Sequence, residues 1–123
     1  MPEELARVDY GYVTSVSKGA NLHFLAGACP LDSEGRVLFD SDCAAQTRQC
    51  FRNALAVLGA GGMTEKNICF SRGLVASCDR SDLVAAWHAL RELLPDMPPA
   101  TLQGVTVLGY EKQLVELEIT AYS

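Results

Sequence analysis

The chain has 123 residues, 15 of them acidic and 10 basic, and a net charge of -5; this length fits one compact domain, which we take to span residues 1–123. The scattered Lys and Arg side chains form no basic stripe, which disfavours nucleic acid as a partner. No segment has the ~20 consecutive apolar residues of a membrane helix, and the acidic start lacks the apolar run of a secretory signal, so we expect a cytoplasmic protein with no membrane partner.

The first half of the chain predicts short strands followed by a helix. Residues 9–17 and 21–28 carry strand-forming side chains on both sides of a turn. A second turn leads into a short strand at 37–39. Apolar residues at helical spacing then predict a helix over 42–59, which Ser41 or Asp40 would cap and glycines would end.

A third long strand is predicted over residues 67–76, where Arg72 lies between Phe70 and Leu74 on one face. A charge on such a face must pair with another charge or reach water.

A second helix is expected over about 80–94, capped by Asp79 or Ser81. Residues 101–108 and 113–122 are expected to form a closing strand pair. The sequence thus predicts an α+β fold in the order β-β-α-β-α-β-β, with two helices packed on one face of a mixed sheet.

The opposite sheet face would lack cover in a monomer. We expect Val, Leu and Ala side chains there, and leaving them in water would cost ~25 cal/mol per Å² of apolar area. Association into a small, closed and symmetric oligomer is the expected remedy.

Four segments carry a more specific pattern. They are NLHFLAGACPLDSEG at 21–35, AQTRQCFRNALAVLGAGG at 45–62, DRSDLVAAWHAL at 79–90 and VLGYEKQLVELEITAY at 107–122. In this order they resemble the YjgF-like family of reactive-intermediate deaminases. The resemblance implies a chorismate-mutase-like homotrimer, in which three sheets form a central barrel and small-molecule ligands bind between subunits.

The resemblance also implies an activity. Members of the family hydrolyse enamines and imines, such as 2-aminoacrylate, to a carbonyl compound and ammonia without a cofactor or metal. A metal site is not expected from the residues either, because His23 and His88 lack a matching cluster of Cys or Asp.

One family motif is altered in this chain. Active deaminases carry an arginine before the penultimate strand, where its planar guanidinium grips the substrate carboxylate through two hydrogen bonds. The corresponding position here is Ala100 or Thr101, neither of which can replace it. The departure argues against the usual hydrolysis of 2-iminocarboxylates.

Glu116 matches the first glutamate of the family's Val-Glu-Ile-Glu strand, which implies a role in positioning or activating water. Alternation places Glu116 and Glu118 on one face of this strand, roughly 6–7 Å apart. We interpret Glu116 as the candidate catalytic residue. An ordinary solvated strand face is the alternative interpretation.

Arg72 is the basic residue of most interest. It could supply an anion-binding guanidinium from a new direction, in place of the arginine missing at Ala100 or Thr101. The favoured alternative is an ion pair at a subunit interface with Glu116 or Glu118.

Three further positions are candidates for ligand binding. Tyr12 stands where the family has a Gly-Pro-Tyr-Ser segment, Gly27 would allow close backbone approach at the cleft, and Trp87 could wall a pocket. Core packing is the more conservative interpretation of Trp87.

The five cysteines are odd in number and unpaired in spacing, which indicates reduced thiols in the cytosol. Cys29 follows Gly27 at the expected cleft edge. His23 is too far along the strand to activate it as a nucleophile, so a catalytic Cys29 is disfavoured.

Three functions remain open at this point. The first is an imine or enamine deaminase with an altered pocket, the second a non-catalytic trimer that binds a small molecule. The third, an endoribonuclease, is weaker because of the acidic net charge.

Overall fold

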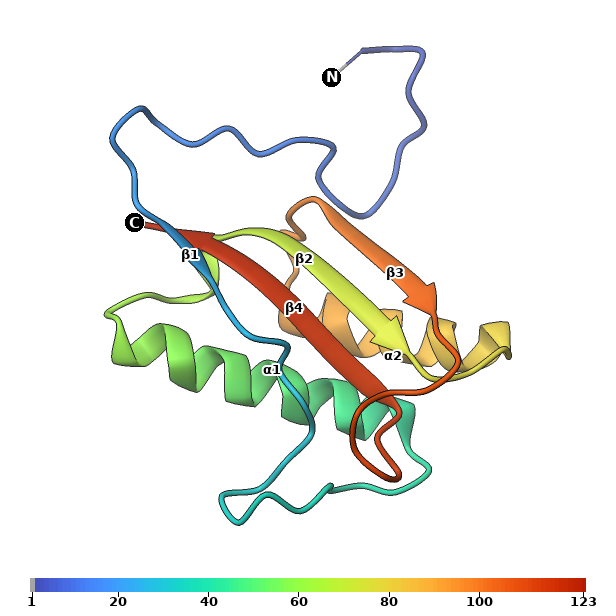
Figure 1. Ribbon diagram of the computed structural model, residues 1–123. Helices are drawn as coiled ribbons and strands as arrows, with labels where there is room; N and C mark the ends of the chain where they lie inside the picture. The colour runs from blue at the N-terminus through green and yellow to red at the C-terminus, as the bar shows by residue number, and fades with distance from the viewer. Residues whose placement is uncertain (1) are drawn as a thin grey trace.

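The computed structural model describes residues 2–123, and within them two helices cover one face of a four-stranded sheet (Figure 1). The helices are α1 (Cys43–Ala60) and α2 (Arg80–Leu93), with one 3-10 turn at Glu65–Asn67. The strands are β1 (Leu22–Phe24), β2 (Ile68–Val75), β3 (Ala100–Gly104) and β4 (Val115–Tyr122). The predicted α+β layering is therefore confirmed.

Helix α1 begins one residue later than predicted, and its cap is Asp42 in place of Ser41 or Asp40. Asp42 has extended backbone (φ -127°, ψ 94°), and its carboxylate accepts a hydrogen bond from the Ala45 amide at 2.9 Å. Ser41 has φ 63° and so lies in the left-handed region, where it cannot serve as the cap. Gly61 closes the other end.

Helix α2 follows the prediction at its start. Asp79 caps it by accepting a hydrogen bond from the Ser81 amide at 2.9 Å. The helix ends at Leu93, ahead of Pro95, whose ring and missing N–H prevent a further turn.

The sheet order is β1-β4-β2-β3. Strand β4 is antiparallel to both β1 and β2, whereas β2 and β3 are parallel. The predicted closing pair is thus wrong, because β2 lies between β3 and β4. Strands β3 and β4 follow one another in the chain, but they pair with opposite edges of β2 and not with each other.

Two predicted strands are absent from residues 2–123. The segment 9–17 forms no strand; instead the Gly11 amide donates to the Met97 carbonyl at 2.8 Å, and Tyr10 packs on Trp87. Residues 37–39 make a single bridge from Val37 to Leu31. Strand propensity is thus outweighed by the contacts that each segment makes or lacks, since neither segment finds a neighbouring strand among residues 2–123 beyond that single bridge.

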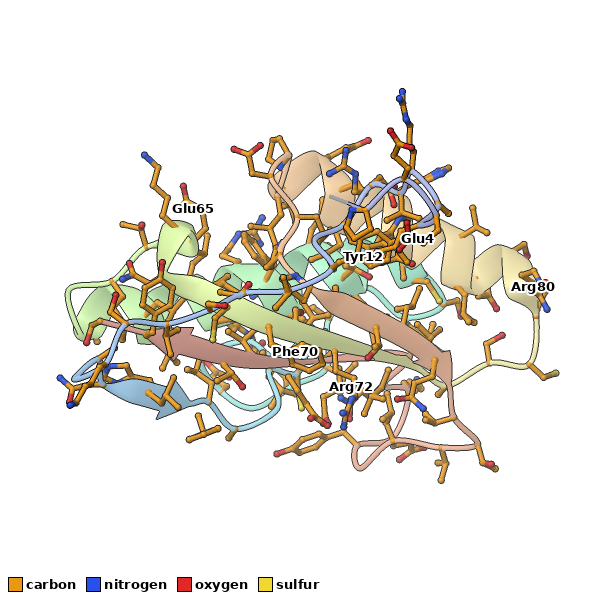
Figure 2. The ribbon with its side chains drawn as sticks, turned by 90° about the horizontal axis from the view of Figure 1, so that it is seen from above. Glu4, Tyr12, Glu65, Phe70, Arg72 and Arg80 are labelled. Atoms are coloured by element: carbon orange, nitrogen blue, oxygen red, sulfur yellow. The ribbon has the colours of Figure 1, made fainter. Side chains whose placement is uncertain are left out.

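The two faces of the sheet differ in chemistry. Alternation on β4 turns the buried side chains toward the helices, where they join the core: Val115, Leu117, Ile119 and Ala121. The uncovered face lacks these residues of β4, but it carries two of the expected leucines, Leu22 and Leu74. That face carries Phe70 and Arg72 of β2, which Figure 2 shows projecting on the side away from the helices.

Candidate functional site

The uncovered face brings three of the predicted site residues onto adjacent strands. Arg72 in β2 is the register partner of Glu118 in β4 and of Thr101 in β3. Leu74, two residues along β2, is the register partner of Glu116. Residues paired in this way project from the same face of the sheet, so Arg72, Glu116 and Glu118 share one surface.

Arg72 is held loosely on this surface. Its Nη1 lies 3.7 Å from Oε2 of Glu118, and its guanidinium lies over the Phe70 ring, 5.8 Å from the ring centre. Its Nε is buried and has no hydrogen-bond partner within residues 2–123. The sequence had allowed a pair with either glutamate, and the structure forms it with Glu118 inside one chain.

Glu116 lies against the backbone of Gly27. A Cβ atom at position 27 would be 2.6 Å from the Glu116 carboxyl carbon and 2.7 Å from its Oε2. Those distances are too short for any side chain, so glycine at this position is what lets the carboxylate lie there. The structure thus places together Gly27 and Glu116, two residues singled out separately in the sequence.

Cys29 completes this cluster. Its Sγ donates to Oε1 of Glu116 at 3.4 Å and lies 3.6 Å from the Gly27 carbonyl. Burial, reinforced by the contact with Glu116, raises the pKa of the Cys29 thiol above its ordinary value. Cys29 therefore remains a protonated donor at neutral pH, a role that the sequence did not reveal.

The segment that carries Gly27 and Cys29 is fixed from two sides. Ala28 exchanges backbone hydrogen bonds with Leu117 of β4 at 2.7 and 3.0 Å. From α1, the Asn53 amide donates to the carbonyls of Cys29 and Leu31, both at 2.9 Å. Asn53 is a positioning residue that sequence reasoning missed, because it lies off the apolar stripe of the helix.

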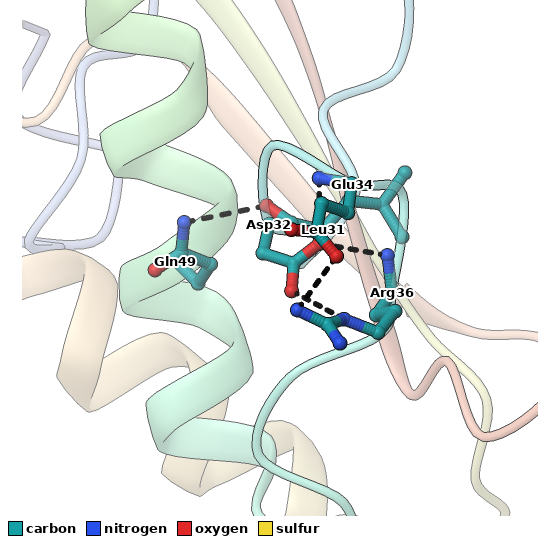
Figure 3. Close-up of polar contacts among 5 residues, drawn as sticks. All are labelled: Leu31, Asp32, Glu34, Arg36 and Gln49. Carbon is teal, nitrogen blue, oxygen red and sulfur yellow. Dashed lines mark hydrogen bonds and ion pairs between the residues drawn. The ribbon is translucent and has the colours of Figure 1, made fainter.

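The turn after Cys29 is fixed in the same way. Gln49 of α1 donates to the Leu31 carbonyl at 3.5 Å, and Asp32 pairs with Arg36 at 3.0 Å (Figure 3). Backbone hydrogen bonds from Arg36 and Glu34, together with the Arg36 charge, hold the pKa of Asp32 below its ordinary value. These contacts fix the conformation of the turn that follows Cys29.

Trp87 and Ala100, two further predicted site residues, lie together at a second place, beside the edge strand β3. A hollow of about 380 Å³ there is lined by Tyr10, Trp87, Ala100, Thr101 and Leu102. The Trp87 Nε1 donates to Asp9 at 2.9 Å. Thr101 links the two places, because it also pairs in register with Arg72.

Tyr12 does not line this hollow. Its hydroxyl donates to the Ala6 carbonyl at 2.6 Å, within the N-terminal segment. Tyr10, two residues earlier, is the tyrosine that lines the hollow.

Within residues 2–123, no group of three or more His, Cys, Asp and Glu side chains has a geometry suited to a metal ion. In the same part of the chain, neither helix has the length and apolar character needed to cross a bilayer.

Comparison with known proteins identifies a family. The model of the family described as endoribonuclease L-PSP matches residues 4–123. None of the curated proteins searched matches the chain.

Solved structures share the fold. The Rid-family protein YyfB of Yersinia pestis is 24% identical with a TM-score of 0.84, covering 98% of this chain and 93% of its own. The Escherichia coli YjgF gene product is 24% identical with a TM-score of 0.72, covering 92% of each chain. Escherichia coli TdcF, solved with bound serine, is 19% identical with a TM-score of 0.74, covering 93% of this chain and 92% of its own.

Proposed function

The chain belongs to the endoribonuclease L-PSP family, which includes the YjgF/Rid proteins, and we propose that it hydrolyses the C=N bond of a small reactive imine in the cytoplasm. The observation that carries this proposal is the Glu116 carboxylate, fixed between Gly27 and Cys29 on the uncovered sheet face. A carboxylate held in one place and partly withdrawn from water suits general acid–base work.

Glu116 acts on water in this proposal. It takes a proton from a water molecule as the water oxygen bonds to the imine carbon, and the electron pair of the C=N bond moves to nitrogen. Glu116 passes this proton to the nitrogen, which gives a neutral carbinolamine. The carboxylate then takes the proton of the carbinolamine hydroxyl and delivers it to the nitrogen as the C–N bond breaks, so the carbonyl forms and ammonia leaves. One water is consumed and the Glu116 carboxylate is regenerated.

The working form is proposed to be a homotrimer with ligands between subunits. The uncovered sheet face supports association, since Phe24 is 76% exposed and Leu22 is 48% exposed. Phe70 and Leu74 extend the same apolar area along β2. Burying such side chains against another subunit is favourable at ~25 cal/mol per Å².

Arg72 is proposed to recognise the substrate. Neither Ala100 nor Thr101 can supply a guanidinium, and Arg72 lies beside Thr101 with an unpartnered Nε. The serine bound to TdcF supports a ligand of amino-acid size. Because Glu118 already pairs with Arg72, we expect a substrate carboxylate to be bound weakly.

A non-catalytic trimer that binds a small molecule is the second candidate. It is favoured by the absence of an arginine at Ala100 or Thr101, where active relatives of the expected type would carry one. An endoribonuclease is disfavoured by the net charge of -5.

The test is an imine-hydrolysis assay. A dehydratase generates 2-aminoacrylate and 2-iminopropionate, an amine oxidase generates imines without a carboxylate, and semicarbazone formation reports their decay. We expect faster hydrolysis of the carboxylate-free imines and weak activity on the other two, with both lost in Glu116→Ala. If the protein accelerates none of these reactions yet binds small molecules in a thermal-shift screen, the binding function replaces the enzyme.

A further inference from the structure

Both oxygens of Glu116 have distinct surroundings. Oε1 accepts the hydrogen bond from Cys29 Sγ at 3.4 Å, whereas Oε2 packs over Gly27 where a Cβ would approach to 2.7 Å. Oε1 therefore accepts a hydrogen bond from a side chain, whereas Oε2 has no side-chain partner among residues 2–123. Such a difference decides which oxygen is available to a bound molecule.

Cys29 is well placed to impose this difference. The backbone bridge between Ala28 and Leu117 places Cys29 across the ladder from Glu116, although the two residues are 87 positions apart in the chain. Asn53 donates to the Cys29 carbonyl at 2.9 Å, which holds the Cys29 backbone in place beside the carboxylate.

We propose that Cys29 is a positioning residue, which holds Oε1 of Glu116 so that Oε2 faces the substrate water. The inference rests on the proposed function for its catalytic meaning. The thiol forms no bond to the substrate and undergoes no redox change. It donates one hydrogen bond, which fixes the carboxylate rotamer before the reaction begins.

Cys29 as a nucleophile fits the site less well. Burial and the Glu116 contact both favour the protonated thiol, whereas nucleophilic attack requires the thiolate. Two other sets of titratable or charged groups lie near Cys29 and Glu116. Cys50 on α1 is buried, and burial raises its pKa. Arg72 and Glu118 form an ion pair on the two central strands, β2 and β4. The Gln113 side chain acts in the opposite direction, by lowering the Cys29 pKa, but its effect is smaller than those of burial and of the Glu116 contact.

The contact can be tested without any enzyme assay. Iodoacetamide, a neutral probe, alkylates thiolates, and peptide mass spectrometry reports the rate at Cys29 separately from the other cysteines. In Glu116→Gln the negative neighbour is removed, so we expect Cys29 to be alkylated at least threefold faster at mildly alkaline pH. Glu118→Gln is the matched control, since Glu118 pairs with Arg72, and should leave the rate within twofold of the parent protein.

The positioning role is tested by activity. Cys29→Ala should lower kcat by about 10-fold, the size expected from one hydrogen bond to a charged group, with KM little changed. Cys29→Ser retains a donor and should recover most of kcat. Circular dichroism shows whether each variant is folded, and the alkylation test does not depend on the Cys29 variants.

Each outcome decides the inference. Equal alkylation rates in the parent and Glu116→Gln, or full kcat in Cys29→Ala, would overturn it. Absence of any imine hydrolysis would refute the proposed function instead, while a Glu116-dependent alkylation rate would still establish that the thiol holds this carboxylate.

Discussion

Arg72 and Glu118 face each other across β2 and β4 with 3.7 Å between Nη1 and Oε2, and each side chain remains 43% exposed. An ion pair this long and this accessible to water contributes little to stability, about 0–1 kcal/mol. The ion pair matters for ligand binding, because the Arg72 guanidinium that could bind a substrate anion already faces the Glu118 carboxylate.

Glu118→Gln should therefore change specificity. The guanidinium of Arg72 loses its anionic partner and becomes free to bind a ligand carboxylate. We expect kcat/KM for 2-iminopropionate to rise about 3- to 10-fold, consistent with one charge-assisted hydrogen bond, while carboxylate-free imines change little. The double variant Glu118→Gln with Arg72→Gln is the control, and a gain that persists in it would rule out Arg72 as the recognising group.

Gly27→Ala should inactivate the site. The new Cβ would lie 2.6 Å from the Glu116 carboxyl carbon, so the carboxylate must shift from the position in which Cys29 donates to it. We expect kcat to fall by 10-fold or more, as found when a catalytic group is displaced by about 1 Å. Gly59→Ala in α1 meets no atom within 4 Å, and it should instead raise stability by about 0.5–1 kcal/mol with unchanged kcat. Retention of kcat in Gly27→Ala would remove Glu116 from the mechanism.

Phe24→Glu should break the proposed trimer. Phe24 is 76% exposed on the strand β1, and a carboxylate there would be buried unpaired at a subunit interface. Analytical ultracentrifugation should show monomers for this variant. Val57→Glu, on the exposed side of α1 and 59% exposed, is the matched control and should remain trimeric. A parent protein that sediments as a single subunit would refute the assembly itself.

Stability should fall at alkaline pH. Burial raises the pKa of Cys29, Cys43 and Cys50 above the ordinary value of 9.0. Above that pH the unfolded chain releases thiol protons that the folded chain retains, so the unfolded state binds fewer protons and is favoured as pH rises. The free energy of unfolding should drop by at most about 1.4 kcal/mol per pH unit for each such thiol.

Urea titrations under reducing conditions between about pH 8 and 10.5 would measure this slope. Cys50→Ala should make the slope shallower, although it lowers stability at neutral pH by leaving a small cavity. An unfolding free energy that stays constant over this range in the parent protein would contradict the prediction.

The helices and their packing could be predicted from the sequence because their signals are local. Apolar residues at helical spacing, Asp79 as a cap and Pro95 as a stop all act within a few residues of one another. The cap of α1 was missed by one or two positions because the left-handed backbone of Ser41 is not visible in its residue type.

The sheet order and the Cys29–Glu116 contact could not be predicted in this way. Strands β3 and β4 are neighbours in the chain but are separated by β2, and that order depends on contacts between distant segments. Glu116 was identified from a family motif, whereas Cys29 meets it only through the bridge between Ala28 and Leu117. Tyr10 and Tyr12 look alike in the sequence, and only the path of the N-terminal segment distinguishes them.

The hydrogen bond between Trp87 and Asp9 makes the fluorescence of Trp87 sensitive to the position of the N-terminal segment. Trp87 is the single tryptophan of the chain, and its indole N–H donates to a residue of the N-terminal segment while Tyr10 packs on its ring. Lifting of that segment would expose the indole to solvent and shift its fluorescence emission to longer wavelength. Ligands that enter the neighbouring hollow can therefore be detected by intrinsic emission, without any label.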